Sequence, residues 1–234
     1  MTDNRQVDAA RPNLTQTLVD GLGKAIVTGR YSRRAFPTEA EITKTQGVSR
    51  SVTREAVKML TAKGLLSARP RQGTVIQPES SWNLFDPDIL RWLVERKPSV
   101  ELLLRFTDLR AGLEPEAAAI AARLHNPVTL RMIYEGLDAM RAAERGERDE
   151  LDADIAFHIA ILRTTDNPFY NQLGAVVATA LRASILITNR AKGHSADIEA
   201  HRAVADAIAD RRPEDARRAM RSLIDDVRAL LERQ

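Results

Sequence analysis

The chain has 234 residues, of which 44% are hydrophobic and 29% charged, and its net charge is +3. This length fits two domains better than one. Because the chain has no cysteine, disulfides and thiolate-bound metal sites are excluded.

The sequence lacks the apolar segments that direct a protein to or across a membrane. No apolar run approaches the roughly 18 residues that a membrane span requires. The amino-terminal segment also lacks the apolar region of a signal peptide. We therefore expect a cytoplasmic protein.

The small net charge hides an uneven distribution. Residues 1–77 hold 13 Lys and Arg against 6 Asp and Glu, whereas residues 78–234 hold 22 against 26. A basic amino-terminal third attracts nucleic acid through counterion release, and a mildly acidic remainder does not. A basic face that is merely solvated explains the charge alone equally well, so the local sequence has to decide.

The amino-terminal part is predicted to contain three helices. Residues 1–12 are polar and aperiodic, so we expect a disordered lead-in. An apolar stripe that begins at Leu14 predicts a first helix ending near Gly29. Two further helices are predicted over residues 38–45 and 49–63.

The ends of these two helices have the signals of a helix-turn-helix. Thr38 and Glu41 have the spacing of a capping box, and Gly47 supplies the left-handed conformation that ends a helix at little cost. Either Ser49 or Ser51 is then suited to cap the next helix.

The helix over 49–63 has two chemically different sides. One side, predicted to face inward, is apolar and consists of Val52, Ala56, Met59 and Leu60. Arg50, Arg54 and Lys58 lie four residues apart on roughly the opposite side. A helix with an apolar back and a row of guanidinium groups near its amino end is suited to a DNA major groove.

Two short strands, over 65–68 and 74–77, are predicted around a basic turn at 70–73. A helix-turn-helix followed by such a hairpin is a winged helix-turn-helix. We therefore expect residues 13–77 to form a DNA-binding domain of three helices and a two-stranded wing. Residues 78–86 are expected to be a linker.

The remainder, residues 87–234, shows almost no strand signal. Helical patterns start at Asp86-Pro87 and continue over 99–124, 127–144, 148–163, 168–189, 196–210 and 213–231. Their short connections predict an all-α bundle of antiparallel helices. A DNA-binding domain joined to such a bundle suggests a switch, so polar residues in the bundle are of interest.

Three of these polar residues have metal-ligand chemistry. Asp154 and His158 lie four apart beside an apolar stripe, so they project from one face of a helix and can share a metal ion. His201 shares a face with Ile198 and Ile208 and should also point inward. For each group alone an ordinary hydrogen-bonded pair is the commoner explanation, but three inward groups on two helices favour a shared ligand.

Arg110 also falls among apolar residues on the long helix over 99–124. A guanidinium cannot lose its charge, so a buried arginine needs an anion. Glu114, one turn further on, is a structural partner, and the carboxylate of a small effector is a functional one. The sequence leaves both open.

The chain resembles the GntR family of bacterial transcription regulators. In the amino-terminal part the resemblance rests on the runs FPTEAEITKTQGVSRSVTREAV and GLLSARPRQGTVI. In the later part it rests on the segments DLRAGLEPEAA, DADIAFHIAILRTTDNP and EAHRAVADAIADRRPEDARRAM. The resemblance is to the FadR-type branch, whose second domain is the all-helical FCD domain. It implies DNA contacts by Ser49, Arg50, Arg54 and Gly73. Many members have an arginine where this chain has Ala40, so no contact is expected there.

The same resemblance implies that Asp154, His158 and His201 bind a divalent metal such as zinc, nickel or manganese. The usual third histidine is Leu223 here, which leaves at most three protein ligands and implies a weak site or none. The connector WNLFDPDILRWL, with Ala40 and Leu223, is most similar to sugar-acid-responsive members. A sugar acid would offer a carboxylate to Arg110 or the metal, and hydroxyls to Asp154, His158, Asn189 and His201.

Together these features predict a homodimeric repressor that binds an inverted-repeat operator and leaves it when a small carboxylate effector binds the bundle. Two alternatives stay open at this point. One is a metal-dependent enzyme whose winged domain only tethers it to DNA. The other is an architectural DNA-binding protein with an inert dimerisation bundle.

Overall fold

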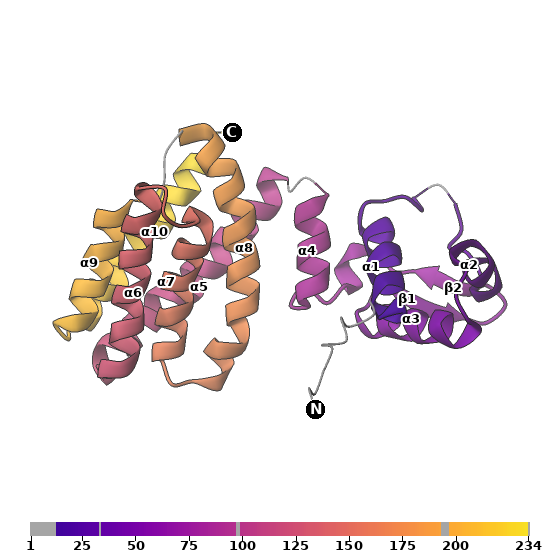
Figure 1. Cartoon of the computed structure of the whole chain (residues 1–234), viewed down its shortest axis with the longest axis horizontal. Coiled ribbons are helices and arrows are strands. Elements are labelled where there is room, and N and C mark those ends of the chain that lie inside the picture. The colour runs from indigo at the N-terminus through magenta and orange to yellow at the C-terminus, as the bar shows by residue number, and fades with distance from the viewer. Residues whose placement is uncertain (1–12, 33, 97–98, 193–196, 234) are drawn as a thin grey trace, which may run out of the picture. The chain divides into compact units, whose positions relative to one another are not determined.

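The computed structural model describes residues 13–32, 34–96, 99–192 and 197–233, and for residues 184–192 it describes the backbone only. The expected disordered lead-in over 1–12 lies outside these residues. Within them the chain forms ten α-helices, one short 3-10 helix and one two-stranded sheet (Figure 1). The chain divides into two compact units, Met1–Arg96 and Lys97–Gln234.

The first unit is a winged helix-turn-helix with an added helix. Its elements are α1 (Leu14–Val27), α2 (Glu39–Gln46), α3 (Arg50–Ala62), β1 (Leu66–Arg69), β2 (Gly73–Ile76), the 3-10 helix η1 (Glu79–Ser81) and α4 (Pro87–Glu95). The strands are antiparallel, with Leu66 opposite Ile76 and Arg69 opposite Gly73. The predicted three helices and wing are therefore confirmed.

The capping residues and the turn glycine that were predicted for α2 and α3 are present in the structure. The Thr38 hydroxyl accepts from the amide of Glu41, and the Glu41 carboxylate accepts from the amide of Thr38, which completes the capping box. Gly47 ends α2 with φ 64°. Ser49, rather than Ser51, caps α3 by accepting from Val52 N at 3.3 Å.

The inward face of α3 is rotated from the one expected. Its buried residues are Thr53, Ala56, Val57 and Leu60, while Val52 and Met59 are half-buried. Thr53 is tolerated inside because its hydroxyl is 2.9 Å from that of Thr43. The opposite side carries the exposed Arg50, Arg54 and Lys58, as predicted.

The wing closes with a tight turn between β1 and β2. Pro70 follows Arg69, Arg71 has φ 65°, and Gln72 N donates to Arg69 O at 3.2 Å. These are the features of a type II turn, with proline at its second residue and a positive φ at its third. Gly73 follows with φ 74°.

The division between the units falls later in the chain than the sequence suggested. Residues 78–86 were expected to be a linker and 87 onward to be the second domain, but α4 packs on α1 within the first unit. Trp92 is 1% exposed and lies against Gly23, where even a Cβ would come within 2.2 Å of the indole. Lys63, the cap residue of α3, donates to Asp86 and Asp88 at the start of α4 at 2.8 to 2.9 Å.

The second unit is a helical bundle, shown from pink to yellow in Figure 1. Its helices are α5 (Val100–Leu124), α6 (Pro127–Glu144), α7 (Glu150–Thr164), α8 (Pro168–Lys192), α9 (Ile198–Ala209) and α10 (Pro213–Leu231). The largest packing surfaces join α5 with α10 and α6 with α7. Close approach of α6 and α7 depends on Gly136, where an added Cβ would lie 2.9 Å from the backbone of Phe157.

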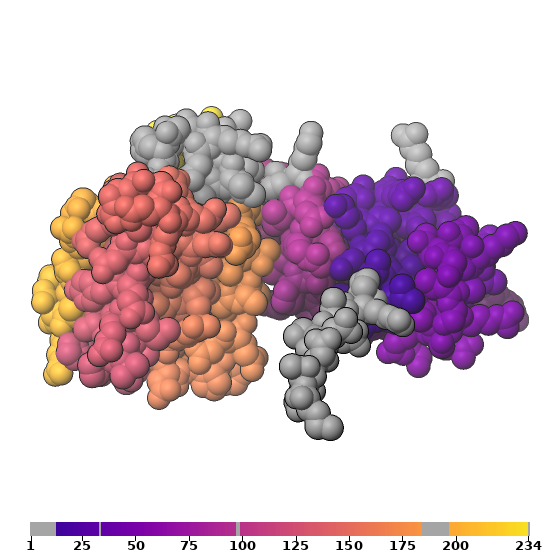
Figure 2. All heavy atoms as spheres, viewed as in Figure 1, coloured from indigo at the N-terminus to yellow at the C-terminus, as the bar shows by residue number. Residues whose placement is uncertain are grey.

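The bundle surrounds one apolar core, to which all six helices α5 to α10 contribute inward-facing residues. In the view of Figure 2, the atoms of α6, α7 and the first part of α8 form the visible face of the bundle. Among the described residues, no helix has the length and apolarity needed to cross a membrane.

Candidate functional site

The candidate residues from the sequence form two groups in the structure, one in each unit. In the first unit Arg50 and Arg54 lie one turn apart on the exposed side of α3, directly after the cap residue Ser49. The Arg54 side chain is 69% exposed, and its Nε is 3.8 Å from Glu39 Oε2 on α2. Gly73 is exposed at the start of β2, with nothing near its Cα that would hinder approach.

This surface combines an exposed helix that carries guanidinium groups with a hairpin whose tip has little steric bulk. An α-helix of this kind fits the major groove, where arginine pairs with guanine edges or phosphates. The surface is therefore suited to double-stranded DNA.

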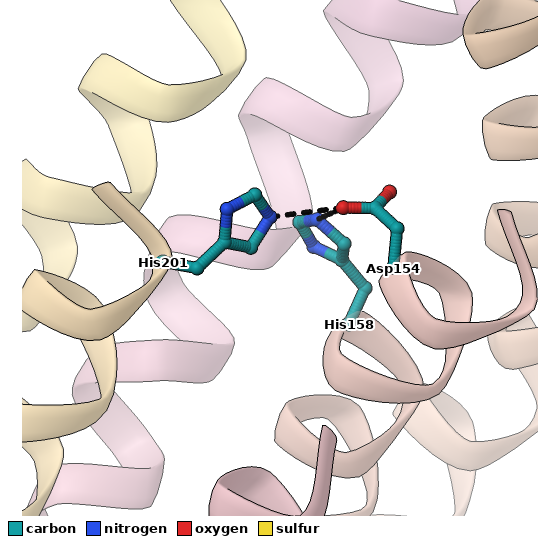
Figure 3. A group of neighbouring side chains, drawn as sticks. All are labelled: Asp154, His158 and His201. Atoms are coloured by element: carbon teal, nitrogen blue, oxygen red, sulfur yellow. Dashed lines mark ion pairs between the residues drawn. The ribbon is translucent and has the colours of Figure 1, made fainter. Parts of the chain in front are cut away.

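The second group is buried in the bundle. Asp154 and His158 from α7 and His201 from α9 each offer one ligand atom, and these atoms all lie within 4.8 Å of one another. Figure 3 shows the three side chains pointing toward one another, with a carboxylate oxygen of Asp154 facing both imidazoles. The exposed fractions are 5% for Asp154, 1% for His158 and 3% for His201. The predicted convergence of these three residues is thus observed.

His201 faces the centre of the cluster with a nitrogen that has no hydrogen bond. Its Nδ1 lies 2.6 Å from the backbone oxygen of Asp197, which places the ring proton on Nδ1. Nε2 is 3.0 Å from Asp154 Oδ1, yet it is buried without a hydrogen-bond partner among the described residues. A buried lone pair opposite a carboxylate is unfavourable unless a positive charge or a donor lies between them.

His158 is anchored in the same manner, from a different helix. Its Nδ1 is 2.5 Å from Glu114 Oε2 on α5. Its Nε2 faces the cluster, 3.9 Å from Asp154 Oδ1 and 3.4 Å from the Nη2 of Arg110. Both imidazoles are thus held at Nδ1 and present Nε2 to a common centre.

Arg110 and Glu114 form an ion pair beside this centre. Arg110 Nε donates to Glu114 Oε1 at 2.6 Å, and the side chains are 2% and 1% exposed. The structural partner that the sequence offered for Arg110 is therefore present. Glu114 was not expected to contact His158, and the only sequence signal for it was its i,i+4 spacing from an inward arginine.

The charges in the cluster keep both carboxyl groups ionised. Burial alone would raise the pKa of Glu114, but the charge of Arg110 and the contact with His158 outweigh it and lower the pKa to about 2. Burial also opposes ionisation of Asp154, whereas His201, His158 and Arg110 lower its pKa to about 2. The centre therefore holds an anionic oxygen between two imidazole nitrogens.

This donor set fits a divalent cation. Two imidazole nitrogens and one carboxylate oxygen are ligands of zinc, nickel and manganese sites, and metal-bound histidines commonly donate their other N–H to a carboxylate or a carbonyl. Glu114 and the backbone of Asp197 occupy those outer positions here. Leu223 is 6% exposed and offers no donor, so among the described residues the cluster offers three ligands.

Asn189 was also expected to face the effector. It belongs to α8, but its side chain lies outside the described residues. Its role therefore stays a prediction.

The chain was compared with known families and proteins. The family described as bacterial regulatory proteins, gntR family, matches residues 14–76, and the FCD domain matches residues 106–226. These two matches correspond to the winged helix-turn-helix and the helical bundle.

Two proteins of Escherichia coli are similar over most of their length. The chain is 31% identical to the galactonate operon transcriptional repressor, over 84% of this chain and 87% of that protein. It is also 31% identical to the uncharacterized HTH-type transcriptional regulator YieP, over 86% of this chain and 87% of that protein.

One solved structure agrees in fold. It is that of Lar, described as controlling the expression of the Listeria monocytogenes agr system. It covers 95% of this chain and 98% of its own, with a TM-score of 0.62 and 17% identity. At that identity the likeness concerns the fold alone.

Proposed function

This chain belongs to the gntR family of bacterial regulatory proteins and carries an FCD domain, and on that premise we propose that it represses an operon for the breakdown of a sugar acid. A small carboxylate effector bound in the helical bundle would release it from its operator. The galactonate operon repressor, as a relative with 31% identity, supports this substrate class.

Operator binding is assigned to the exposed surface of α3 and the wing. Two copies of the chain would place their α3 helices on the half-sites of an inverted repeat, since two-fold protein symmetry matches a pseudo-palindrome. Arg50 and Arg54 would contact bases or phosphates, Ser49 would approach the backbone, and Gly73 would let the wing come close. Each bidentate arginine–guanine pair contributes roughly 1–3 kcal/mol of discrimination.

Effector binding is assigned to the buried cluster. A divalent cation held by Asp154, His158 and His201 would supply a positive charge to carboxylate and hydroxyl oxygens. Glu114 and Asp197 fix the two imidazoles so that Nε2 faces inward. Arg110 keeps its Nη2 beside His158, and this group would donate to the carboxylate of the effector.

The observation that carries this assignment is the buried Nε2 of His201, which lies 3.0 Å from the Asp154 carboxylate in the FCD domain and has no hydrogen bond to any of the described residues. Such a centre favours an occupant that neutralises it. Binding of that occupant can shift the protein toward its DNA-free arrangement only by the difference in its affinity for the two arrangements.

A thermal-shift screen tests the proposal. The protein is mixed with aldonates and uronates, with and without zinc, nickel or manganese, and active mixtures are then added to the complex with promoter DNA. A ligand at about 100 times its Kd stabilises the folded protein by about 2.7 kcal/mol, which is readily measured. The variant His201→Ala should lose the metal-dependent shift.

The comparisons and the screen also bear on the two alternatives, the metal-dependent enzyme and the architectural DNA-binding protein. Because the family and its relatives are transcriptional regulators, the enzyme hypothesis is dropped. An architectural protein with an inert bundle would bind DNA and show neither a thermal shift nor release by any sugar acid. That result would contradict the proposed function.

A further inference from the structure

A hollow of about 270 Å³ lies in the first unit, apart from the residues assigned above. One side is a single face of α1, and the other sides are the start of the loop after α1 and the turn between α2 and α3. Its lining residues are Leu14, Thr17, Leu18, Gly21, Leu22, Ala25, Arg30, Tyr31, Gln46 and Val48.

Gly21 on this face has no structural explanation within the described part of the unit. A glycine inside a helix destabilises it relative to alanine, so packing or function usually explains its presence. Gly23 is explained, because a Cβ there would collide with Trp92 at 2.2 Å. At Gly21 a Cβ would meet nothing within 4 Å. The open space over Gly21 therefore suits a group from outside the described residues that approaches the α1 backbone closely.

The chemistry of the hollow indicates the kind of group. Its floor is apolar, with Leu18, Leu22 and Val48 at hand, while Thr17 and Gln46 offer neutral donors. Arg30 lines the hollow as well, and no acidic residue does. Within the described residues the Arg30 guanidinium has no carboxylate partner. An apolar floor with a cation and neutral donors fits a group that is part hydrocarbon and part anion.

The position of the hollow selects one such partner. Gln46 and Val48 flank Gly47, the residue that ends α2, and Val48 directly precedes Ser49, the cap of α3. The hollow therefore borders the turn that leads into α3, the helix assigned to DNA. Most protein contacts to a DNA strand beside the groove are made by cations and neutral donors to phosphate and sugar.

We propose that this hollow binds a sugar–phosphate segment of the DNA strand that borders the groove entered by α3. The deoxyribose lies on the apolar floor above Gly21, and Arg30, Thr17 and Gln46 donate to the phosphate. The inference rests on the proposed DNA-binding function. It adds to that function a contact that increases affinity without reading sequence.

Two variants test it on the full-length protein. Gly21→Ala should raise the melting temperature by about 2–4 °C because alanine favours the helix, and yet weaken DNA binding because the methyl group fills the space for the sugar. Gly112→Ala is the matched control. Gly112 also lies inside a helix with nothing within 4 Å of its Cβ position, but in the second unit, so this variant should leave DNA affinity unchanged.

Arg30→Ala tests the phosphate contact. Its affinity for the chain's own upstream promoter fragment and for an unrelated duplex should fall by the same factor, about tenfold near 0.1 M salt, and the salt slope should decrease by about 1. Fluorescence anisotropy over a salt series measures both. A loss confined to the promoter fragment would mean base reading and would overturn the inference.

The remaining outcomes separate this inference from the proposed function. If the unaltered protein binds the promoter fragment and both variants bind it equally well, the hollow is not a DNA contact. A lower melting temperature for Gly21→Ala would make Gly21 structural, and a changed oligomeric state at unchanged DNA affinity would make the hollow an interface between copies. If the unaltered protein binds no DNA, the proposed function itself fails.

Discussion

The two units place their polar functional side chains in opposite environments. On α3 the arginines are exposed, with 69% of the Arg54 side chain open to solvent. In the bundle Arg110, Glu114 and His158 are each 1% exposed. The difference fits the kind of partner that each unit would bind. A long polyanion such as DNA binds at an exposed surface, whereas a small ligand is recognised in a site from which water is excluded and where charges interact strongly.

The contrast also concerns how each arginine is neutralised. Arg110 is paired with Glu114 at 2.6 Å, whereas the carboxylate that lies near Arg54 within the described residues is 3.8 Å away. A buried charge must be paired in the folded chain, whereas an exposed charge is solvated by water until its partner binds. Variants that exchange or remove these partners therefore test the comparison directly.

The largest effect is expected for Glu114→Gln. Neutralising this carboxylate removes the anion that is hydrogen-bonded to the buried Arg110 guanidinium, which should lower the free energy of unfolding by about 3–5 kcal/mol. Chemical denaturation measures it. The control is Glu116→Gln two residues along α5, because the Glu116 side chain is 41% exposed in its pairs with Arg123 and Arg217. That variant should lose at most about 1 kcal/mol; equal losses would refute the contrast.

Arg50→Ala should act on DNA and not on the fold. Removing one arginine–guanine pair should lower operator affinity by roughly fivefold to a hundredfold, at an unchanged melting temperature. Anisotropy with the upstream promoter fragment gives the affinity. Lys58→Ala, two turns along the same exposed face, is the control and should have the smaller effect. Unchanged affinity for Arg50→Ala would remove the assignment of α3 as the DNA-reading helix.

His158→Ala should separate the two functions. The variant should bind the operator normally, but the effector found in the thermal-shift screen should lose most of its coupling to DNA release, which is typically about 1–3 kcal/mol. His125→Ala serves as the control, because His125 contacts the backbone of Ala209 outside the cluster. A normal dose–response for His158→Ala would place the effector pocket elsewhere.

The smallest effect is expected at the junction of α3 and α4. Lys63→Met removes a side chain that is 14% exposed and joins Asp86 and Asp88, and should lower the free energy of unfolding by about 1 kcal/mol. Denaturation of both proteins across pH measures the difference. An equal loss at every pH would show that the charge interaction does not matter.

The pH dependence of that difference follows from the shifted pKa values. Burial would raise the pKa of Asp88, but hydrogen bonds from Lys63 and Arg91 lower it below 3.8. Burial would lower the pKa of Lys63, but hydrogen bonds to Asp86 and Asp88 raise it above 10.5. The interaction of Lys63 with Asp86 and Asp88 thus stabilises the fold fully between about pH 4 and pH 10.5. It is lost as pH falls through the lowered pKa of Asp88 or rises through the raised pKa of Lys63.

Most of the fold follows from signals that act within one element. The capping box at Thr38, the turn at Gly47 and the cap at Ser49 depend on a few neighbouring residues, so they were predictable. The side of α3 that faces the core was harder to predict, because the burial of Thr53 depends on its contact with Thr43 on α2.

The position of α4 was not predictable from its own amphipathic pattern. That pattern fits packing on either unit, and the slot for Trp92 at Gly23 exists only once α1 has folded. In the cluster, Asp154, His158 and His201 were predictable as inward residues. The contact of Glu114 with His158 joins residues 44 apart on different helices, and no periodicity reports such a contact.

The imidazole anchors have a mechanical consequence. Glu114 belongs to α5, His158 to α7 and His201 to α9, so an occupant of the cluster would link three helices that are distant in sequence. Moving any one of these helices would change the geometry offered to that occupant, and a change of occupant would in turn act on the spacing of all three. Binding in the cluster could therefore change the relative positions of α5, α7 and α9.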